Sequence, residues 1–214
     1  MEIRFMEERD IPSVAALEQA CFSMPWSETS LRESMESGHT IFLVAEEQGE
    51  IAGYMGLYAV LDEGDVTNVA VDSAYRRRGI GRALLQYMIE LARGRGIRVI
   101  HLEVRTSNEP AKALYTQLGF QNIGLRKNFY DRPKEDACLM QLAVTPNPVC
   151  NCCGREIHAE SPQSEEYLAV EKQWGYFSKG KDGLRQRFWL CEDCYDRMTA
   201  GFLHPVLEEE TTEW

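Results

Sequence analysis

The sequence lacks the features that would place it in a membrane, on a secretory route or on nucleic acid. Its 214 residues contain no apolar run long enough to cross a bilayer. The first residues, Met1 to Arg4, lack the basic-then-apolar pattern of a signal peptide. Only 23 basic residues stand against 34 acidic ones, a formal net charge of −11. We therefore expect a cytoplasmic protein without membrane association, for which a basic partner is favoured over direct nucleic-acid binding.

The pattern of apolar residues changes after about residue 145. Before that point, β-rich segments alternate with amphipathic helices, which predicts an α/β (α+β) fold with a mixed sheet and helices on both faces. Pro146 and Pro148 disfavour helix and strand and mark a linker over 146–149. We expect one domain over 1–145 and a second, smaller domain over 150–214.

The stretch from 68 to 85 combines a strand, a glycine-containing turn and the beginning of a helix. Gly79 and Gly81 permit a sharp turn, and the helix after them directs free N–H groups and the positive end of its dipole outward. Such an arrangement binds phosphate. The Lys-Ser or Lys-Thr of a P-loop is missing, and Leu84 stands where the dinucleotide fingerprint needs Gly or Ala. An atypical dinucleotide site and a turn without a ligand remain alternatives.

Several further motifs resemble the GCN5-related N-acetyltransferases, a family that binds acetyl-CoA. They are Arg76-x-x-Gly79-x-Gly81, Ala70-Val71-Asp72, Leu102-Glu103-Val104-Arg105, Ser107-Asn108, Ala113-Leu114-Tyr115, Leu118-Gly119-Phe120, Pro25-Trp26-Ser27 and Arg126-x-Asn128-Phe129-Tyr130. Together they are similar to the ribosomal-protein-alanine branch of that family over residues 1–145. The resemblance implies the family's mostly antiparallel sheet. It also implies acetyl transfer to a protein N-terminal amine, namely the N-terminal alanine of small-subunit ribosomal protein eighteen.

The resemblance also assigns roles to individual residues. Glu103 matches the general base, and Tyr115 matches the acid that protonates the leaving thiolate. From the residues alone, a surface carboxylate and a half-buried core tyrosine are the alternatives. The residues expected to contact acetyl-CoA are Val69, Ala70, Val71, Arg77, Arg78, Gly79, Ile80, Gly81, Arg82 and Asn108.

Three residues are expected to contact the substrate. Asp62 and Glu63 lie in the predicted loop before the cofactor strand, where a basic peptide would dock. Tyr130 matches an aromatic residue of the peptide site in related N-terminal acetyltransferases. The alternatives are a solvated acidic turn and ordinary strand packing. At the level of function, the alternatives are lysine side chains or small amines as acceptors, and a non-catalytic acetyl-CoA sensor.

Four cysteines form two CxxC pairs, Cys150 with Cys153 and Cys191 with Cys194. In a reducing compartment this spacing predicts a structural zinc site of four thiolates in a zinc-ribbon-like domain. Cys152 in place of Cys153, disulfides and a redox pair are the alternatives. The aromatic residues expected to form a small core around the site are Trp174, Tyr176, Phe177, Phe188 and Trp189. The domain, with its acidic tail at 208–210, is expected either to stabilise the chain or to dock a protein partner.

Overall fold

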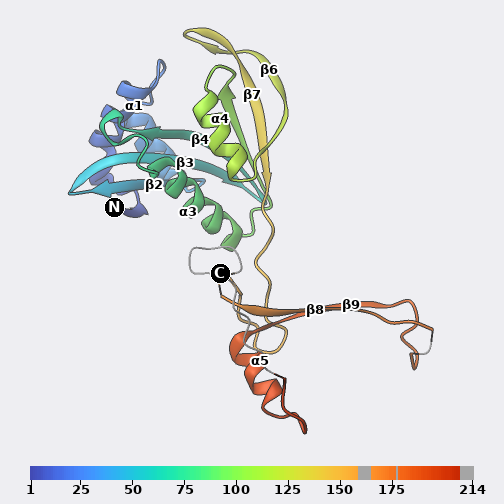
Figure 1. Ribbon diagram of the computed structural model, residues 1–214. Coiled ribbons are helices and arrows are strands. Elements are labelled where there is room, and N and C mark those ends of the chain that lie inside the picture. The colour runs from blue at the N-terminus through green and yellow to red at the C-terminus, as the bar shows by residue number, and fades with distance from the viewer. Residues whose placement is uncertain (159–164, 177, 208–214) are drawn as a thin grey trace. The chain divides into compact units, whose positions relative to one another are not determined.

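The computed structural model describes residues 1–158, 165–176 and 178–207 (Figure 1). The chain divides into two compact units, Met1–Pro146 and Asn147–Trp214. The acidic tail at 208–210 and Phe177 lie outside the described residues. Within those residues, no helix combines the length and the apolar character needed to span a membrane.

The first unit is built on a seven-stranded sheet with the order β1-β2-β3-β4-β5-β7-β6. The strands are β1 (Glu2–Phe5), β2 (Thr40–Glu47), β3 (Glu50–Val60), β4 (Glu63–Val71), β5 (Val99–Arg105), β6 (Gln121–Asp131) and β7 (Lys134–Ala143). Every neighbouring pair is antiparallel except β4 and β5. The predicted mixed, mostly antiparallel sheet is therefore confirmed.

Helices cover both faces of this sheet, as predicted (Figure 1). On one face lie α3 (Ile80–Gly94) and α4 (Glu109–Gln117), with Leu84, Leu85 and Met88 of α3 buried at helical spacing. On the other face lie α1 (Ile11–Cys21) and α2 (Glu28–Glu36), together with a second apolar cluster. Two short 3-10 turns, η1 (Glu8–Asp10) and η2 (Ser73–Tyr75), complete the unit.

A β-bulge at Thr67 separates β4 from its parallel neighbour. β4 pairs with β3 on both sides of Thr67, where the register shifts by one residue. Its pairing with β5 is confined to Glu63, Gly64 and Asp65. Bulges bend a strand and increase its twist, so the carboxyl ends of β4 and β5 diverge. The sheet opens at the position where an open α/β sheet typically binds its ligand.

The second unit contains a hairpin of β8 (Tyr167–Gln173) and β9 (Arg185–Cys191), followed by α5 (Glu192–Thr199). Its buried residues are Cys150, Ile157, Leu190, Cys191 and Cys194, with Phe188 and Trp189 partly buried against them. The prediction that Trp174 and Tyr176 belong to this core was wrong. They lie beyond the end of the paired strands, where Tyr176 is 83% exposed and Trp174 stacks with Lys181.

Candidate active site

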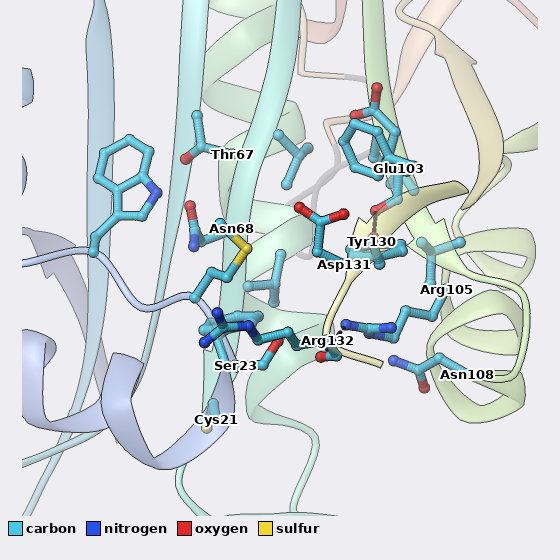
Figure 2. Close-up of a pocket in the computed structure, with 18 of the residues that line it drawn as sticks. Cys21, Ser23, Thr67, Asn68, Glu103, Arg105, Asn108, Tyr130, Asp131 and Arg132 are labelled. Carbon is cyan, nitrogen blue, oxygen red and sulfur yellow. Dashed lines mark hydrogen bonds between the residues drawn. The ribbon is translucent and has the colours of Figure 1, made fainter. Parts of the chain in front are cut away.

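A cavity of about 640 Å³ occupies the opening between β4 and β5 (Figure 2). Its walls come from four parts of the first unit: the segment after α1, the diverging strands, the beginning of α4, and the β6–β7 turn. The lining residues that matter for the argument are Thr67, Asn68, Glu103, Tyr115, Tyr130 and Asp131. Segments far apart in the sequence therefore meet at one cavity.

Glu103 reaches this cavity because β5 alternates strictly. Ile100, Leu102 and Val104 are buried, and the residues between them are not. The Glu103 side chain is 28% exposed, and its Oε1 accepts a hydrogen bond from Arg126 Nη1 at 3.1 Å. It also lines an adjoining pocket of about 390 Å³ with Asp65, Ile123 and Leu125. One carboxylate thus stands where the two pockets meet.

Tyr115 lies on α4 and approaches the cavity from the face of the sheet that α3 and α4 cover. It is 8% exposed and packs against Phe120 with 5.8 Å between the ring centroids. Burial, and to a smaller extent the neighbouring Tyr130, raises the pKa of Tyr115 to about 12. The hydroxyl keeps its proton at neutral pH and is available as an acid. Tyr115 belongs to the core and also lines the cavity, so the predicted acid and the alternative of a core tyrosine are compatible.

The turn before α3 has the backbone geometry of a phosphate cradle. Arg77 and Gly79 adopt positive φ angles of 62° and 83°, and Ala83 makes the first intrahelical bond, to Gly79 O at 3.0 Å. The N–H groups of residues 80 to 82 therefore precede the helical bonding pattern and point outward. No atom lies within 4 Å of a Cβ built on Gly79, so a ligand can approach closely. These features fit the diphosphate of acetyl-CoA.

The remaining predicted cofactor residues are divided between this turn, the cavity and the end of β4, where Ala70 is buried and Val71 O accepts from Arg76 Nε at 3.1 Å. Val69 and Asn108 line the cavity, and the Asn108 side chain also caps α4 by accepting from Ala111 N at 3.2 Å. Arg78 lies over the Tyr75 ring at 5.2 Å, and Arg82 donates to Gln117 at the end of α4. The turn and the cavity are joined by the end of β4.

The structure does not bring Asp62 and Glu63 to the cavity. Glu63 is the first residue of β4 and not part of a loop, and neither residue lines either pocket. Asp62 lies at the end of β4 opposite to Val69, with its carboxylate 3.9 Å from Arg98 Nε. The acidic residue of this region that does line a pocket is Asp65, two positions further along the strand.

The sequence interpretation missed the β6–β7 turn as a wall of the site. Asp131 and Arg132 come from this turn, and Figure 2 shows the Asp131 carboxylate directed into the opening. Arg105 holds the turn by donating to Arg132 O and Pro133 O, both at 3.0 Å, and its guanidinium stacks on Tyr130 at 4.1 Å. No local motif marks these contacts, because they depend on the register of β6 against β7.

The second unit gathers four cysteine sulfurs. Those of Cys150, Cys153, Cys191 and Cys194 all lie within 4.8 Å of one another, and the Cys153–Cys191 separation is 3.8 Å. Four sulfurs about 2.3 Å from a common zinc ion would lie roughly 3.8 Å apart. Cys152 is exposed and outside the group. The arrangement suits a tetrahedral metal ion held by thiolates.

Comparison with known proteins now gives the family. Residues 11–120 match the model of the acetyltransferase (GNAT) family. The chain is also 37% identical over 145 residues to the ribosomal protein bS18-alanine N-acetyltransferase of Escherichia coli (strain K12), which covers 67% of this chain and 97% of that protein. The chain belongs to the GNAT acetyltransferase family. It is an acetyl-CoA-dependent N-acetyltransferase, as the sequence motifs predicted.

A second relative and a solved structure agree with this assignment. The N-alpha-acetyltransferase RimI of Mycobacterium tuberculosis is 38% identical over 121 residues, covering 55% of this chain and 75% of that protein. The crystal structure of the ribosomal-protein-S18-alanine N-acetyltransferase from Escherichia coli superposes with a TM-score of 0.63 at 36% identity. That superposition covers 67% of this chain and 94% of the other.

Proposed function

We propose that this GNAT enzyme acetylates the α-amino group of a protein N-terminus, and that its substrate is the N-terminal alanine of ribosomal protein bS18. The observation that carries the proposal is the arrangement of Glu103 and Tyr115 around one opening in the sheet. The Glu103 carboxylate and the protonated Tyr115 phenol reach this opening from opposite faces of the sheet. The names of relatives that are 37% identical support the same acceptor.

In this proposal each step of acetyl transfer is assigned to particular residues of the chain. Acetyl-CoA supplies the activated acetyl group, and the turn over 77–82 holds its diphosphate. An α-ammonium has a pKa of about 8, so Glu103 need remove only one proton at neutral pH, directly or through a water molecule. Tyr115 gives its proton to the departing thiolate, and the second proton that the nitrogen loses as the amide forms restores the phenol. The backbone of residues 69–71, beyond the pairing with β5, is available to bind the pantetheine arm and to stabilise charge on the carbonyl oxygen.

The pocket that adjoins Glu103 suits the residues that follow the substrate's N-terminus. It combines the acidic side chain of Asp65 with Ile123 and Leu125, which are 54% and 51% exposed. An apolar residue of the peptide would be buried against Ile123 and Leu125, and a basic residue would pair with Asp65. Tyr130 lines the neighbouring cavity, with its hydroxyl donating to Glu103 O at 3.2 Å. We assign the docking of the peptide to these residues in place of Asp62 and Glu63.

The acceptor amine is tested directly by peptide acetylation. The full chain is incubated with acetyl-CoA and a short peptide that begins with alanine and contains one lysine. A matched control peptide has its N-terminus blocked. Tandem mass spectrometry should place the acetyl group on the free N-terminus and find the blocked peptide unmodified. Equal acetylation of lysine in both peptides would replace this proposal with the lysine-acceptor alternative.

We also propose that the four-cysteine group of the second unit binds a structural zinc ion. Burial opposes ionisation of Cys150, but backbone N–H groups of Cys191, Cys153 and Cys152 donate to its sulfur and lower its pKa to about 6. Thiolates are the form that zinc binds, and because burial raises the pKa of Cys194 to about 12, that thiol would lose its proton only on binding the metal. The absence of disulfides among the described cysteines leaves all four sulfurs available as ligands.

A further inference from the structure

Asp131 presents an unpaired carboxylate to the cavity. It is the last residue of β6, where its backbone pairs with that of Lys134 at the beginning of β7. Among the residues that the structure describes, no salt bridge and no hydrogen bond engages the Asp131 carboxylate. Figure 2 shows this carboxylate directed into the opening. An unpaired negative charge at the wall of a cavity attracts a ligand of the opposite sign.

The other charged side chains that line the cavity leave this charge uncompensated. Two of them belong to ion pairs of 3.1 Å, namely Glu103 with Arg126 and Arg105 with Glu135. The third, Arg132, is directed away from the Asp131 carboxylate, toward the segment after α1 (Figure 2). The other titratable groups at the cavity wall are Cys21, Tyr115 and Tyr130. Burial raises the pKa of both tyrosines to about 12, so neither is charged near neutral pH.

The turn that carries Asp131 is fixed to the rest of the site. Glu135 accepts hydrogen bonds from Ser107 N at 2.7 Å and from Thr106 Oγ1 at 3.0 Å, which hold the beginning of β7 against the loop before α4. Arg105 donates to Glu135 at 3.1 Å and to two backbone carbonyl oxygens of the turn at 3.0 Å. Bonds that involve charged groups are strong, so the position of Asp131 is set before a ligand arrives. A group positioned in advance loses little entropy on binding.

The position of Asp131 suits the acceptor better than it suits the cofactor. Tyr130 directly precedes Asp131, and its hydroxyl donates to Glu103 O at 3.2 Å, so the turn lies beside the proposed base. Acetyl-CoA is anionic, and its diphosphate is assigned to the turn over 77–82. An α-amine with a pKa of about 8 arrives at neutral pH mostly as a cation. The ligand that complements Asp131 is therefore the ammonium of the acceptor.

We propose that Asp131 binds the acceptor's ammonium and holds it beside Glu103 until the proton leaves. The ammonium donates one N–H bond to the Asp131 carboxylate, which keeps its charge throughout. Glu103 removes a different proton, and the nitrogen lone pair that this exposes attacks the acetyl carbonyl. Asp131 thus favours acceptors that are cationic on arrival. The inference rests on the proposed function in taking an amine as the acceptor and Glu103 as the base.

The test compares Asp131→Asn with wild type, using the full chain, acetyl-CoA and a peptide that begins with alanine and contains no lysine. Asparagine keeps the size of the side chain and removes its charge. At about pH 6.5 we expect the acceptor KM to rise about five- to tenfold, between the effect of an exposed ion pair and that of a hydrogen bond to a charged group. The KM for acetyl-CoA should stay within about twofold, and the melting temperature should hold. Asp62→Asn is the matched control, because Asp62 lines neither pocket.

The pH dependence separates ammonium binding from a structural role. As the pH rises through the α-amine's pKa of about 8, the acceptor loses its charge and its attraction to Asp131. The ratio of variant to wild-type acceptor KM should therefore fall to below about twofold at about pH 9.5. Glu103 and Cys21 are present in both proteins, so their own titrations cancel in this ratio. Asp131→Glu, which restores the charge, should recover part of the lost affinity.

An acceptor KM within about twofold of wild type at about pH 6.5 would overturn the proposal. So would a ratio for the alanine peptide that stays the same up to about pH 9.5, or a parallel rise of both KM values with a lower melting temperature. If the wild type acetylates lysine and not the N-terminus, the N-terminal proposal fails, and the KM comparison is made with that lysine peptide. Because lysine has a pKa of about 10.4, the ratio should then still be raised at about pH 9.5. A ratio near one with the lysine peptide would exclude Asp131 from acceptor binding.

Discussion

At the scale of single residues, the carboxylate of Glu103 is the group on which the proposed chemistry depends most. Glu103→Gln keeps the shape and the contact with Arg126 but cannot accept the proton of the ammonium. We expect kcat to fall about 10²- to 10⁴-fold, while the KM for acetyl-CoA changes little. Steady-state kinetics measures both, with the exposed Glu36→Gln on α2 as control. Full turnover in Glu103→Gln would remove Glu103 from the role of base.

Tyr115→Phe gives a prediction about pH. Since the pKa of Tyr115 is raised to about 12, the hydroxyl is protonated, and so able to donate, throughout the neutral range. We expect kcat to fall about 10²-fold in the variant, by the same factor at every pH from about 6 to 9. The ring still packs against Phe120, so the melting temperature should hold. A ratio of wild-type to variant kcat that shrinks steadily toward pH 9 would contradict this assignment.

Which residues could be predicted from the sequence depends on how local their determinants are. Glu103 and Tyr115 stand in short motifs on one strand and one helix, and both reach the cavity. Asp131 reaches the same cavity only through the register of β6 against β7 and through the bonds of Arg105 to its turn, which no local pattern records. Charge alone misplaced Asp62 and Glu63, because they stand at the beginning of β4 and the cavity opens toward its other end.

At the scale of elements, the bulge in β4 needs a glycine opposite it on β3. A Cβ on Gly56 would lie 2.4 Å from Thr67 Oγ1 and 2.7 Å from Phe42 Cε1. We expect Gly56→Ala to lower the free energy of unfolding by about 1–3 kcal/mol, the usual cost of overpacking. Urea denaturation measures this change. Gly94→Ala is the control, because nothing lies within 4 Å of its added Cβ at the end of α3.

The sequence predicted these elements more reliably than the irregularity within them. The sequence of β5 alternates in step with its two faces, and Asn108, a residue type that caps helices, stands at the beginning of α4. The strand predicted within 68–85 is the end of a longer strand, β4, which begins at Glu63 and carries an extra residue at Thr67 that was not predicted. A bulge leaves the residue types of a strand unchanged, so only the pairing with β3 reveals it.

At the scale of the whole molecule, the two units differ in what stabilises them. The first has two extended apolar clusters, one on each face of its sheet. Three of the five buried residues in the second unit's cluster are cysteines, and only Ile157 and Leu190 are aliphatic. So small an apolar core does not stabilise a domain without a cross-link or a metal. The second unit should therefore depend on its metal, and the first should not.

This difference predicts two separable responses of the full chain to loss of metal. Elemental analysis should find about one zinc ion per chain, and a strong chelator or Cys191→Ser should remove it. Limited proteolysis should then cut within Asn147–Trp214 while Met1–Pro146 survives and still acetylates the peptide. The control is Cys152→Ser, which lies outside the cluster and should keep its metal. Protection of the second unit after chelation would exclude a metal as its stabilising element. The first unit holds every residue proposed to carry the chemistry, so loss of acetylation together with the metal would contradict the independence of the two units.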